Sequence, residues 1–406
     1  MKKRRTIPPR RRLRLSSFDV NAIRSLLRGE SVIDWHRLHF ENEREVARFL
    51  RLNEFHVEVR ADMEYLERLR EEAVEYLRRT FSLKIPIYLA EETPAKELLL
   101  QASGKGKDRL TACTILKIML ILHHLDGHEV DYRLPVSRDE LTSLVEAKVV
   151  QVVEEIRAAD VPVIEFSWSR KSRDSLITKL LSKRDTIASK VYDRLRFRII
   201  VKERSHLVPL IWELLHRLIP FNYIIPGESD NSLLQTHDIE RYIQEDVRNI
   251  KQNNAKGIPD EMFVELKSGP SNEFSSPDYR IINFVTDLPI RVEPFMNRVP
   301  MMEWDRLVPM TFVLAEFQIA DWATAKSNEQ GDCNHELYKQ RQLNTVKKRL
   351  LNEGFHGEFH DSSGKRKKRN QKRPSPKLDG ELVEIKKWEE SKSKEELLKE
   401  TNTPLT

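Results

Sequence analysis

The stretch from Phe166 to Lys202 reads FSWSRKSRDSLITKLLSKRDTIASKVYDRLRFRIIVK, and it carries the clearest structural signals in the chain. In its first half, apolar residues recur at helical spacing between cations, which predicts a basic helix with one packed face. Its last residues, Phe197 to Val201, form a short apolar run typical of a buried strand. The stretch therefore predicts a basic helix that leads into the core of a sheet.

Asp193 comes just before this strand, with Arg194, Arg196 and Arg198 around it. A carboxylate at a strand edge can hold a magnesium ion, and fixed cations can hold a polyphosphate. The composition of this segment therefore points to metal-dependent phosphoryl or pyrophosphoryl transfer. The alternative is a solvated basic helix face, which is common in a highly charged chain.

This stretch resembles the synthetase domain of the RelA/SpoT alarmone synthetases, which carries R-x-K-x-x-x-S-I-x-x-K and then D-x-x-G-x-R-I-I-V. Lys171, Ser175 and Lys179 have the spacing of the first pattern, and Asp193 and Arg198 have that of the second. Two positions depart from the pattern. Arg196 replaces the family glycine, and the first arginine is displaced by one position, to Arg170.

A second block, TFVLAEFQIAD, runs from Thr311 to Asp321. Strand alternation places Glu316 and Gln318 on one face of an otherwise apolar strand. The block resembles the family's E-x-Q-I-R-T strand, with Ala320 in place of the arginine. The resemblance implies that Glu316 lies opposite Asp193, so that both carboxylates hold Mg²⁺ and act in catalysis. Taken alone, Glu316 is interpreted as a solvent-facing strand residue, and its pairing with Asp193 in the order of elements favours the site.

Two weaker blocks complete the resemblance. DYRIINFVT, residues 278–286, resembles the family's G-Y-x-S-L-H segment, so Tyr279 is either a platform for the acceptor base or a plain strand aromatic. NHELYK, residues 334–339, resembles A-H-W-x-Y-K, so His335 either contacts a phosphate or is structural. The resemblance implies an ATP and phosphate site of Lys171, Ser175, Lys179, Lys183, Arg198 and His335, and an acceptor site of Tyr279, Asn283 and Gln318.

The fold class expected is α/β (α+β), with a mixed five-stranded nucleotidyltransferase-like sheet flanked by helices and preceded by a helical region. The strands expected are Phe197–Val201, Phe221–Ile225, Tyr279–Val285, Ile290–Phe295 and Thr311–Ile319. The domain organisation expected is a basic disordered tail at 1–15, a helical region at 16–136, a synthetase domain at 137–355 with an insertion at 228–277, and a basic low-complexity tail at 356–406.

Charged residues make up 33% of the 406 residues, with a formal net charge of +6, which favours polyanionic partners. The runs Lys2–Arg14 and Lys365–Lys377 supply part of the basic charge, either as solvated tails or as contacts to RNA or the ribosome. Two cysteines, Cys113 and Cys333, without metal-ligand spacing favour a reducing compartment. With no secretory signal and no expected membrane span, we expect a cytoplasmic protein.

The segment from Leu110 to Leu125 is strongly apolar and predicts a buried core helix that ends near Gly127. His123, His124 and Asp126 are then expected as helix-terminal residues and not as the ligands of a metal-dependent hydrolase. A capping box, Ser137 to Glu140, opens the next helix, which is expected to run to about Ala159.

The resemblance implies an ATP-dependent pyrophosphokinase that transfers pyrophosphate to a ribose hydroxyl of a guanosine nucleotide. An RNA 3′ end as acceptor is a variant of the same reaction. The rival interpretation is a catalytically degenerate nucleotide- or RNA-binding regulator with the same fold, which the departures at Arg196, Asn283 and Ala320 favour.

Overall fold

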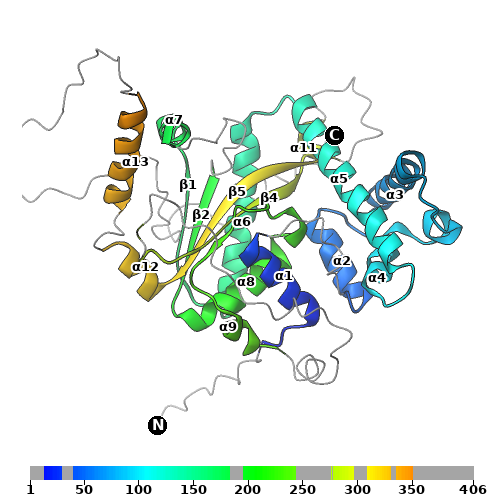
Figure 1. Ribbon diagram of the computed structural model, residues 1–406, viewed down its shortest axis with the longest axis horizontal. Helices are drawn as coiled ribbons and strands as arrows, with labels where there is room; N and C mark the ends of the chain where they lie inside the picture. The colour runs from blue at the N-terminus through cyan, green and yellow to red at the C-terminus, as the bar shows by residue number, and fades with distance from the viewer. Residues whose placement is uncertain are drawn as a thin grey trace, which may run out of the picture.

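A computed structural model describes residues 13–29, 40–182, 195–243, 276, 278–296, 309–330 and 335–350 of the chain. Within these residues lies a five-stranded mixed sheet in the order β1-β2-β5-β4-β3, with helices around it (Figure 1). The expected fold class is therefore confirmed. The strands are β1 (Val163–Arg170), β2 (Leu195–Val201), β3 (Asp230–Asn231), β4 (Ile282–Arg291) and β5 (Met310–Asp321).

The helices of the first part of the chain are α1 (Ser17–Arg28), α2 (Glu43–Leu52), α3 (Arg60–Phe81), α4 (Leu98–Ser103), α5 (Arg109–Arg133) and α6 (Arg138–Ala158). Those of the second part are α7 (Arg173–Ser182), α8 (Leu207–Arg217), α9 (Thr236–Glu240), α11 (Glu293–Met296), α12 (Trp322–Asn328) and α13 (His335–Leu350). Short turns of 3-10 or π helix are η2 (Tyr88–Glu92), η3 (Ala95–Glu97), η5 (Arg204–His206) and η6 (Phe221–Tyr223). Figure 1 shows α3, α4 and α5 at one side of the sheet and α7, α12 and α13 at the other.

The central pair of the sheet is β2 and β5, which run parallel, while β1, β4 and β3 add in antiparallel pairs at the two sides. One face is lined by phenylalanines from four strands. Phe197 stacks on Phe317 with ring centroids 5.2 Å apart, and Phe284 stacks on Phe317 at 5.3 Å. Helices α6 and α8 pack against the sheet and share its apolar core. Because this face is filled by rings, polar chemistry is confined to the opposite face.

The capping box before α6 is confirmed. Ser137 Oγ accepts from the Glu140 backbone N–H, and Glu140 accepts from the Ser137 backbone N–H. The helix extends to Ala158, close to the expected end. This helix brings the chain to β1, which the sequence interpretation missed because residues 166–170 were assigned to the basic helix. The alternation Phe166-Ser167-Trp168-Ser169 was the overlooked strand signal.

The expected strand at Phe221–Ile225 is wrong, because the chain there forms the 3-10 turn η6 after Pro220 and only Ile224 makes an isolated bridge, to Thr286. The two strands expected at 279–285 and 290–295 are corrected to the single strand β4, followed by the short helix α11. Pro289 is tolerated inside β4 because β3 pairs only with residues 282 and 283, so the outer edge of β4 needs no N–H donor at Pro289.

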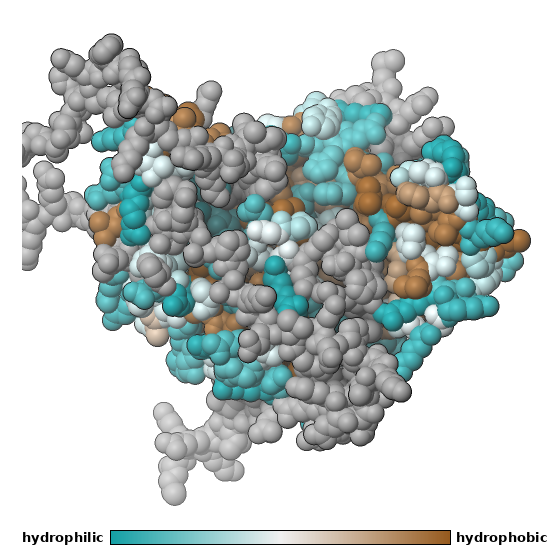
Figure 2. Space-filling model, in the orientation of Figure 1, coloured by the Kyte–Doolittle hydropathy of each residue, from teal (hydrophilic) through white to brown (hydrophobic). Residues whose placement is uncertain are grey.

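Helix α5 does not end near Gly127 but continues to Arg133. A Cβ atom at Gly127 would lie 2.3 Å from Cε2 of Phe312 on β5, so this glycine allows the helix to cross the sheet closely. The helix is also long and apolar enough to cross a membrane by length and composition, which corrects the expectation that no stretch is. Its apolar residues pack against α3, α4 and β5, while Leu110, Leu125 and Tyr132 are exposed. Figure 2 shows hydrophobic residues gathered on this side of the molecule.

Candidate functional site

The register of the strands brings polar side chains together on one face of the sheet. In the parallel pairing of β2 with β5, Arg196 stands beside Glu316 and Arg198 stands beside Gln318. Since residues two apart on a strand point to the same side, these four side chains share the face opposite the phenylalanines. The sequence expectation that Glu316 and Gln318 point the same way is confirmed, because Gln318 Nε2 donates to Glu316 Oε1 over 3.2 Å.

A row of polar residues crosses the whole sheet on this face. The strand pairings place Arg198 next to Gln318, Gln318 next to Asn283, and the row ends at Ser167 on β1 and Asp230 on β3. Asn283 Oδ1 is buried and has no hydrogen-bond partner among the described residues. The row therefore offers hydrogen-bonding groups beside the cations, and it places the predicted acceptor residues Asn283 and Gln318 together.

Glu316 is the centre of the site. Its side chain is almost fully buried, and Arg196 Nε lies 2.8 Å from its Oε2 atom. Burial raises the pKa of Glu316, but the guanidinium of Arg196 and the ammonium groups of Lys171 and Lys179 bring it below its ordinary value. Burial lowers the pKa of Arg196, but the charge and hydrogen bond of Glu316, together with Tyr279 and Tyr338, bring it above its ordinary value. Both residues are therefore charged at neutral pH.

Helix α7 brings two of the predicted phosphate-binding lysines to this face. Lys171 precedes the helix and Lys179 lies in its last turn, and both are close enough to Glu316 to lower its pKa. Ser175 is engaged in the first turn of the helix, where its Oγ lies 3.0 Å from Ser172 Oγ and its backbone N–H donates to the same atom. Helix α7 packs beside α13, as Figure 1 also shows.

Tyr279 and Arg198 lie at the same site. Burial raises the pKa of the Tyr279 hydroxyl, and the guanidinium groups of Arg198 and Arg196 oppose this rise. Arg198 makes ion pairs with Glu165 and Glu329, at 3.6 and 3.2 Å. Tyr338 of α13 also lies close enough to shift the pKa of both Tyr279 and Arg196. Tyr279, from the block at residues 278–286, therefore lies close to Arg196 and Arg198 of β2.

Three predicted site residues cannot be placed in this arrangement. Asp193 and Lys183 fall outside the described residues. Helix α13 begins at His335, but the side chain of His335 is likewise outside the description. The meeting of Asp193 with Glu316 therefore stays a prediction.

Sequence reasoning missed the site roles of Arg196 and Tyr338. Arg196 was noted only as a departure from the family glycine, although strand alternation already placed it on the same side as Arg198. Arg170, the family arginine displaced by one position, points away from the site and toward α6. Its guanidinium donates two hydrogen bonds of 2.7 Å to Glu146 of α6.

A carboxylate is a suitable ligand for magnesium, but Glu316 does not fit that role as it stands. One of its oxygens accepts from Arg196 and the other from Gln318. A cation would have to displace the guanidinium, whose positive charge occupies the same position. The described residues therefore define a buried, positively charged polar site with one neutralised carboxylate, and an ordinary use of such a site is to bind the phosphates of a nucleotide.

No protein-family model matches the chain, and no curated protein matches it. The sheet and its helices define an α+β protein with a mixed five-stranded sheet. Comparison with solved structures finds small alarmone synthetases and a GTP pyrophosphokinase family protein among the similar chains. The small alarmone synthetase 1 from Bacillus subtilis, bound to its product pppGpp, is 14% identical, with a TM-score of 0.27 over 54% of this chain and 85% of that chain.

A GTP pyrophosphokinase family protein from Streptococcus pneumoniae is 13% identical, with a TM-score of 0.25 over 52% of this chain and 83% of that chain. The small alarmone synthetase 2 from Bacillus subtilis is 12% identical, with a TM-score of 0.25 over 51% of this chain and 93% of that chain. These are proteins of the class that the sequence blocks resemble.

Proposed function

We propose that this protein is an ATP-dependent pyrophosphokinase that acts on a ribose hydroxyl of a guanosine nucleotide. The observation that supports the proposal is the buried Glu316 carboxylate, surrounded by Arg196, Lys171 and Lys179 on the polar face of the sheet. Fixed cations in a site shielded from water stabilise the negative charge that develops during transfer. The aromatic ring of Tyr279 at the same site provides a surface on which a base can stack.

In this reaction the ribose hydroxyl oxygen attacks the β-phosphorus of ATP. A new O–P bond forms, the bond between the β-phosphorus and the oxygen that bridges to the α-phosphate breaks, and AMP leaves with the electron pair. We assign the hydroxyl proton to Glu316. When the phosphates of the substrate bind Arg196, they draw the guanidinium away from Oε2, and the freed carboxylate becomes a better proton acceptor. The Mg²⁺ ion expected at Asp193 and Glu316 would bind only after the same displacement of Arg196 from Glu316, because the guanidinium occupies the position of the cation.

A second candidate function is nucleotide binding without transfer. It is supported by the Arg196–Glu316 ion pair itself, because a guanidinium stands where the family pattern has glycine and neutralises the carboxylate. In this case the site binds polyphosphates and the protein acts as a nucleotide-dependent regulator. The basic tails then provide contacts to RNA or the ribosome, and we place the protein in the cytoplasm.

One experiment separates the two functions. The full-length protein is incubated with ATP labelled on the γ-phosphate and with GDP, GTP or tRNA, each with and without magnesium. The variants are Glu316→Gln, which keeps the shape of the side chain, and Asp193→Ala. The control is Glu155→Gln on α6, which pairs with Arg217 away from the site.

Transfer of the label to GDP or GTP supports the pyrophosphokinase if this transfer is abolished in both site variants and unchanged in the control. Label that moves to tRNA instead identifies an RNA acceptor. ATP binding without transfer supports the regulator. Absence of both binding and transfer in the wild-type protein contradicts both proposals.

A further inference from the structure

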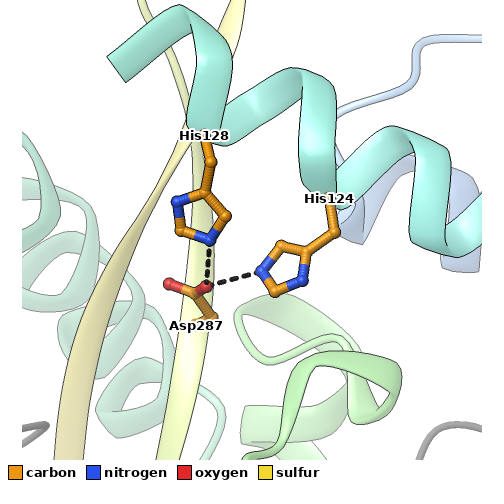
Figure 3. A group of neighbouring side chains, drawn as sticks. All are labelled: His124, His128 and Asp287. Atoms are coloured by element: carbon orange, nitrogen blue, oxygen red, sulfur yellow. Dashed lines mark hydrogen bonds and ion pairs between the residues drawn. The ribbon is translucent and has the colours of Figure 1, made fainter. Parts of the chain in front are cut away.

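A second cluster of polar side chains lies where helix α5 crosses the sheet. His124 and His128 project from one face of α5, four residues apart, toward Asp287 of β4 (Figure 3). His124 Nε2 lies 2.7 Å from Asp287 Oδ2, and His128 Nε2 lies 3.7 Å from the same atom. The expectation that His123, His124 and Asp126 are helix-terminal is thus wrong, because α5 runs through this segment.

The other residues of that histidine segment do not belong to the cluster. His123 is buried among aromatic rings, and Asp126 accepts a hydrogen bond of 2.6 Å from Tyr65. Asp131, one turn beyond His128, makes an ion pair with Arg138. The three atoms that converge are therefore two imidazole nitrogens and one carboxylate oxygen, all within 4.8 Å of one another.

The carboxylate of Asp287 is incompletely satisfied by its protein neighbours. It is 3% exposed, and its Oδ1 atom has no hydrogen-bond partner among the described residues. The hydroxyl of Tyr223, whose ring lies beside that of His124 with centroids 5.5 Å apart, is also buried and unpartnered within the described part of the chain. Buried carboxylates are normally fully paired or bound to a metal, and a cation held between Asp287 and the two histidines would satisfy this one.

The surroundings hold the two rings in place. The ring of Phe312 meets the ring of His124 edge-on, with centroids 4.7 Å apart, and lies 6.0 Å from that of His128. Gly127 between the histidines lets the helix approach Phe312, and its carbonyl accepts a hydrogen bond from Thr311 over 2.9 Å. The ligand atoms are thus positioned by packing and not by loops, which is what a metal site requires.

From this geometry we infer that His124, His128 and Asp287 bind a divalent transition-metal ion of the zinc type. Two imidazoles and one carboxylate are a typical three-ligand set for zinc with a fourth position open to water, whereas magnesium and calcium take oxygen ligands. In a tetrahedral site the ligand atoms lie about 3.3 Å apart, as follows from metal–ligand bonds of about 2 Å. The observed separations of 2.7 and 3.7 Å lie on either side of that value.

The site is open to solvent on one side. The side chains of His124 and His128 are 36% and 46% exposed, whereas that of Asp287 is 4% exposed. An ion can therefore enter between the rings and reach the buried carboxylate. When bound, it ties α5 of the helical region to β4 of the sheet.

The site is also a neighbour of the candidate nucleotide site. Asp287 and Val285 lie on the same face of β4, and Val285 pairs with Glu316. Two residues along a strand span about 7 Å. The inferred zinc site nevertheless shares no residue with the nucleotide site, and its test does not depend on the proposed reaction.

The test uses tag-free, chelator-treated full-length protein without nucleotide. Zinc binding is measured by calorimetry, and Co²⁺ is used as a spectroscopic probe because its tetrahedral complexes absorb strongly in the visible range. The variants are His128→Gln, at a partly exposed position, and Asp287→Asn, which keeps the hydrogen bond from His124. The matched control is His237→Gln, a surface histidine beside Asp238 in another part of the fold.

We expect one zinc ion per wild-type chain, a higher Tm with zinc, and a Co²⁺ spectrum of a tetrahedral site. Binding weakens at least tenfold in both variants and is unchanged in His237→Gln and Glu316→Gln, and magnesium alone does not raise the Tm. The inference is overturned by absence of zinc binding in the wild-type protein, or by binding that survives unchanged in His128→Gln and Asp287→Asn.

Discussion

Arg196 Nε lies 2.8 Å from Glu316 Oε2, and the pair is formed between two residues that stand side by side on parallel strands. The carboxylate that the resemblance assigns to magnesium is thus held by a guanidinium that takes the place of a family glycine. This one ion pair bears on stability, on pH dependence and on the choice between the two candidate functions.

Replacing Arg196 by Ala should lower the free energy of unfolding by about 3 to 5 kcal/mol, because it leaves the buried Glu316 carboxylate without its partner. Arg198→Ala is the matched control on the same strand. It removes partly exposed ion pairs and should cost at most about 1 kcal/mol. Urea unfolding of both variants measures the difference, and similar losses would contradict the buried-pair interpretation.

Stability should depend on pH through Glu316. Its pKa in the folded protein is lower than the ordinary value of 4.5, so the unfolded chain takes up this proton more readily. The contribution of the pair is therefore complete above pH 4.5 and is lost as the pH falls through the folded pKa. The difference in unfolding free energy between wild type and Glu316→Gln, measured from pH 7 downward, should shrink in that range. A difference that grows toward low pH would contradict this direction.

Lys171→Ala and Lys179→Ala should each weaken ATP binding about 10- to 150-fold, because a hydrogen bond to a charged phosphate contributes roughly 1.5 to 3 kcal/mol. Both lysines lie near the site carboxylate. Lys96→Ala in the helical region is the control and should leave the affinity unchanged. Titration calorimetry with ATP at two salt concentrations tests this, and equal affinities for all three variants would place the ATP site elsewhere.

Tyr279→Phe should keep binding of the guanosine nucleotide, whereas Tyr279→Ala should weaken it about 5- to 150-fold, since stacking of a base on an aromatic ring contributes about 1 to 3 kcal/mol. The ring lies beside Arg196 and Arg198. Affinity for GDP, measured separately from that for ATP, is the appropriate readout. If Phe and Ala lower the affinity equally, Tyr279 acts through its hydroxyl and not as a platform.

Gly127→Ala should destabilise the fold by about 1 to 3 kcal/mol, although alanine favours a helix, because the new methyl group would overlap the ring of Phe312. Gly106→Ala is the control, since nothing lies within 4 Å of a Cβ atom there. Thermal and urea unfolding compare the two. If Gly127→Ala leaves the free energy of unfolding unchanged, α5 can shift away from β5 without loss of stability.

Much of the sheet could be predicted from the sequence because its central strands are apolar and regular. The run at Phe197–Val201 and the alternation at Thr311–Ile319 predicted β2 and β5 almost to their ends. The edge strands were harder to find. β1 is interrupted by polar residues and precedes a basic segment, and β3 has only two residues, so neither offers a long periodic signal.

The candidate site was predictable in part. Glu316, Gln318, Lys171 and Lys179 were chosen from spacing and resemblance, and the structure places them together. The partner of Glu316 could not be chosen in this way, because the adjacency of residues 120 positions apart depends on which strands pair and in which register. The same holds for His124 and Asp287, which are separated by 163 positions.

Hydrophobic periodicity and local capping are short-range properties, so the amino-acid pattern alone predicts which strand residues are polar and which helix carries the lysines. The pairing of charged side chains across the fold depends on tertiary packing. Strand register set Arg196 against Glu316, and a glycine in α5 brought two histidines to Asp287. Contacts of this kind depend on the packing of the whole chain, and no local pattern encodes them.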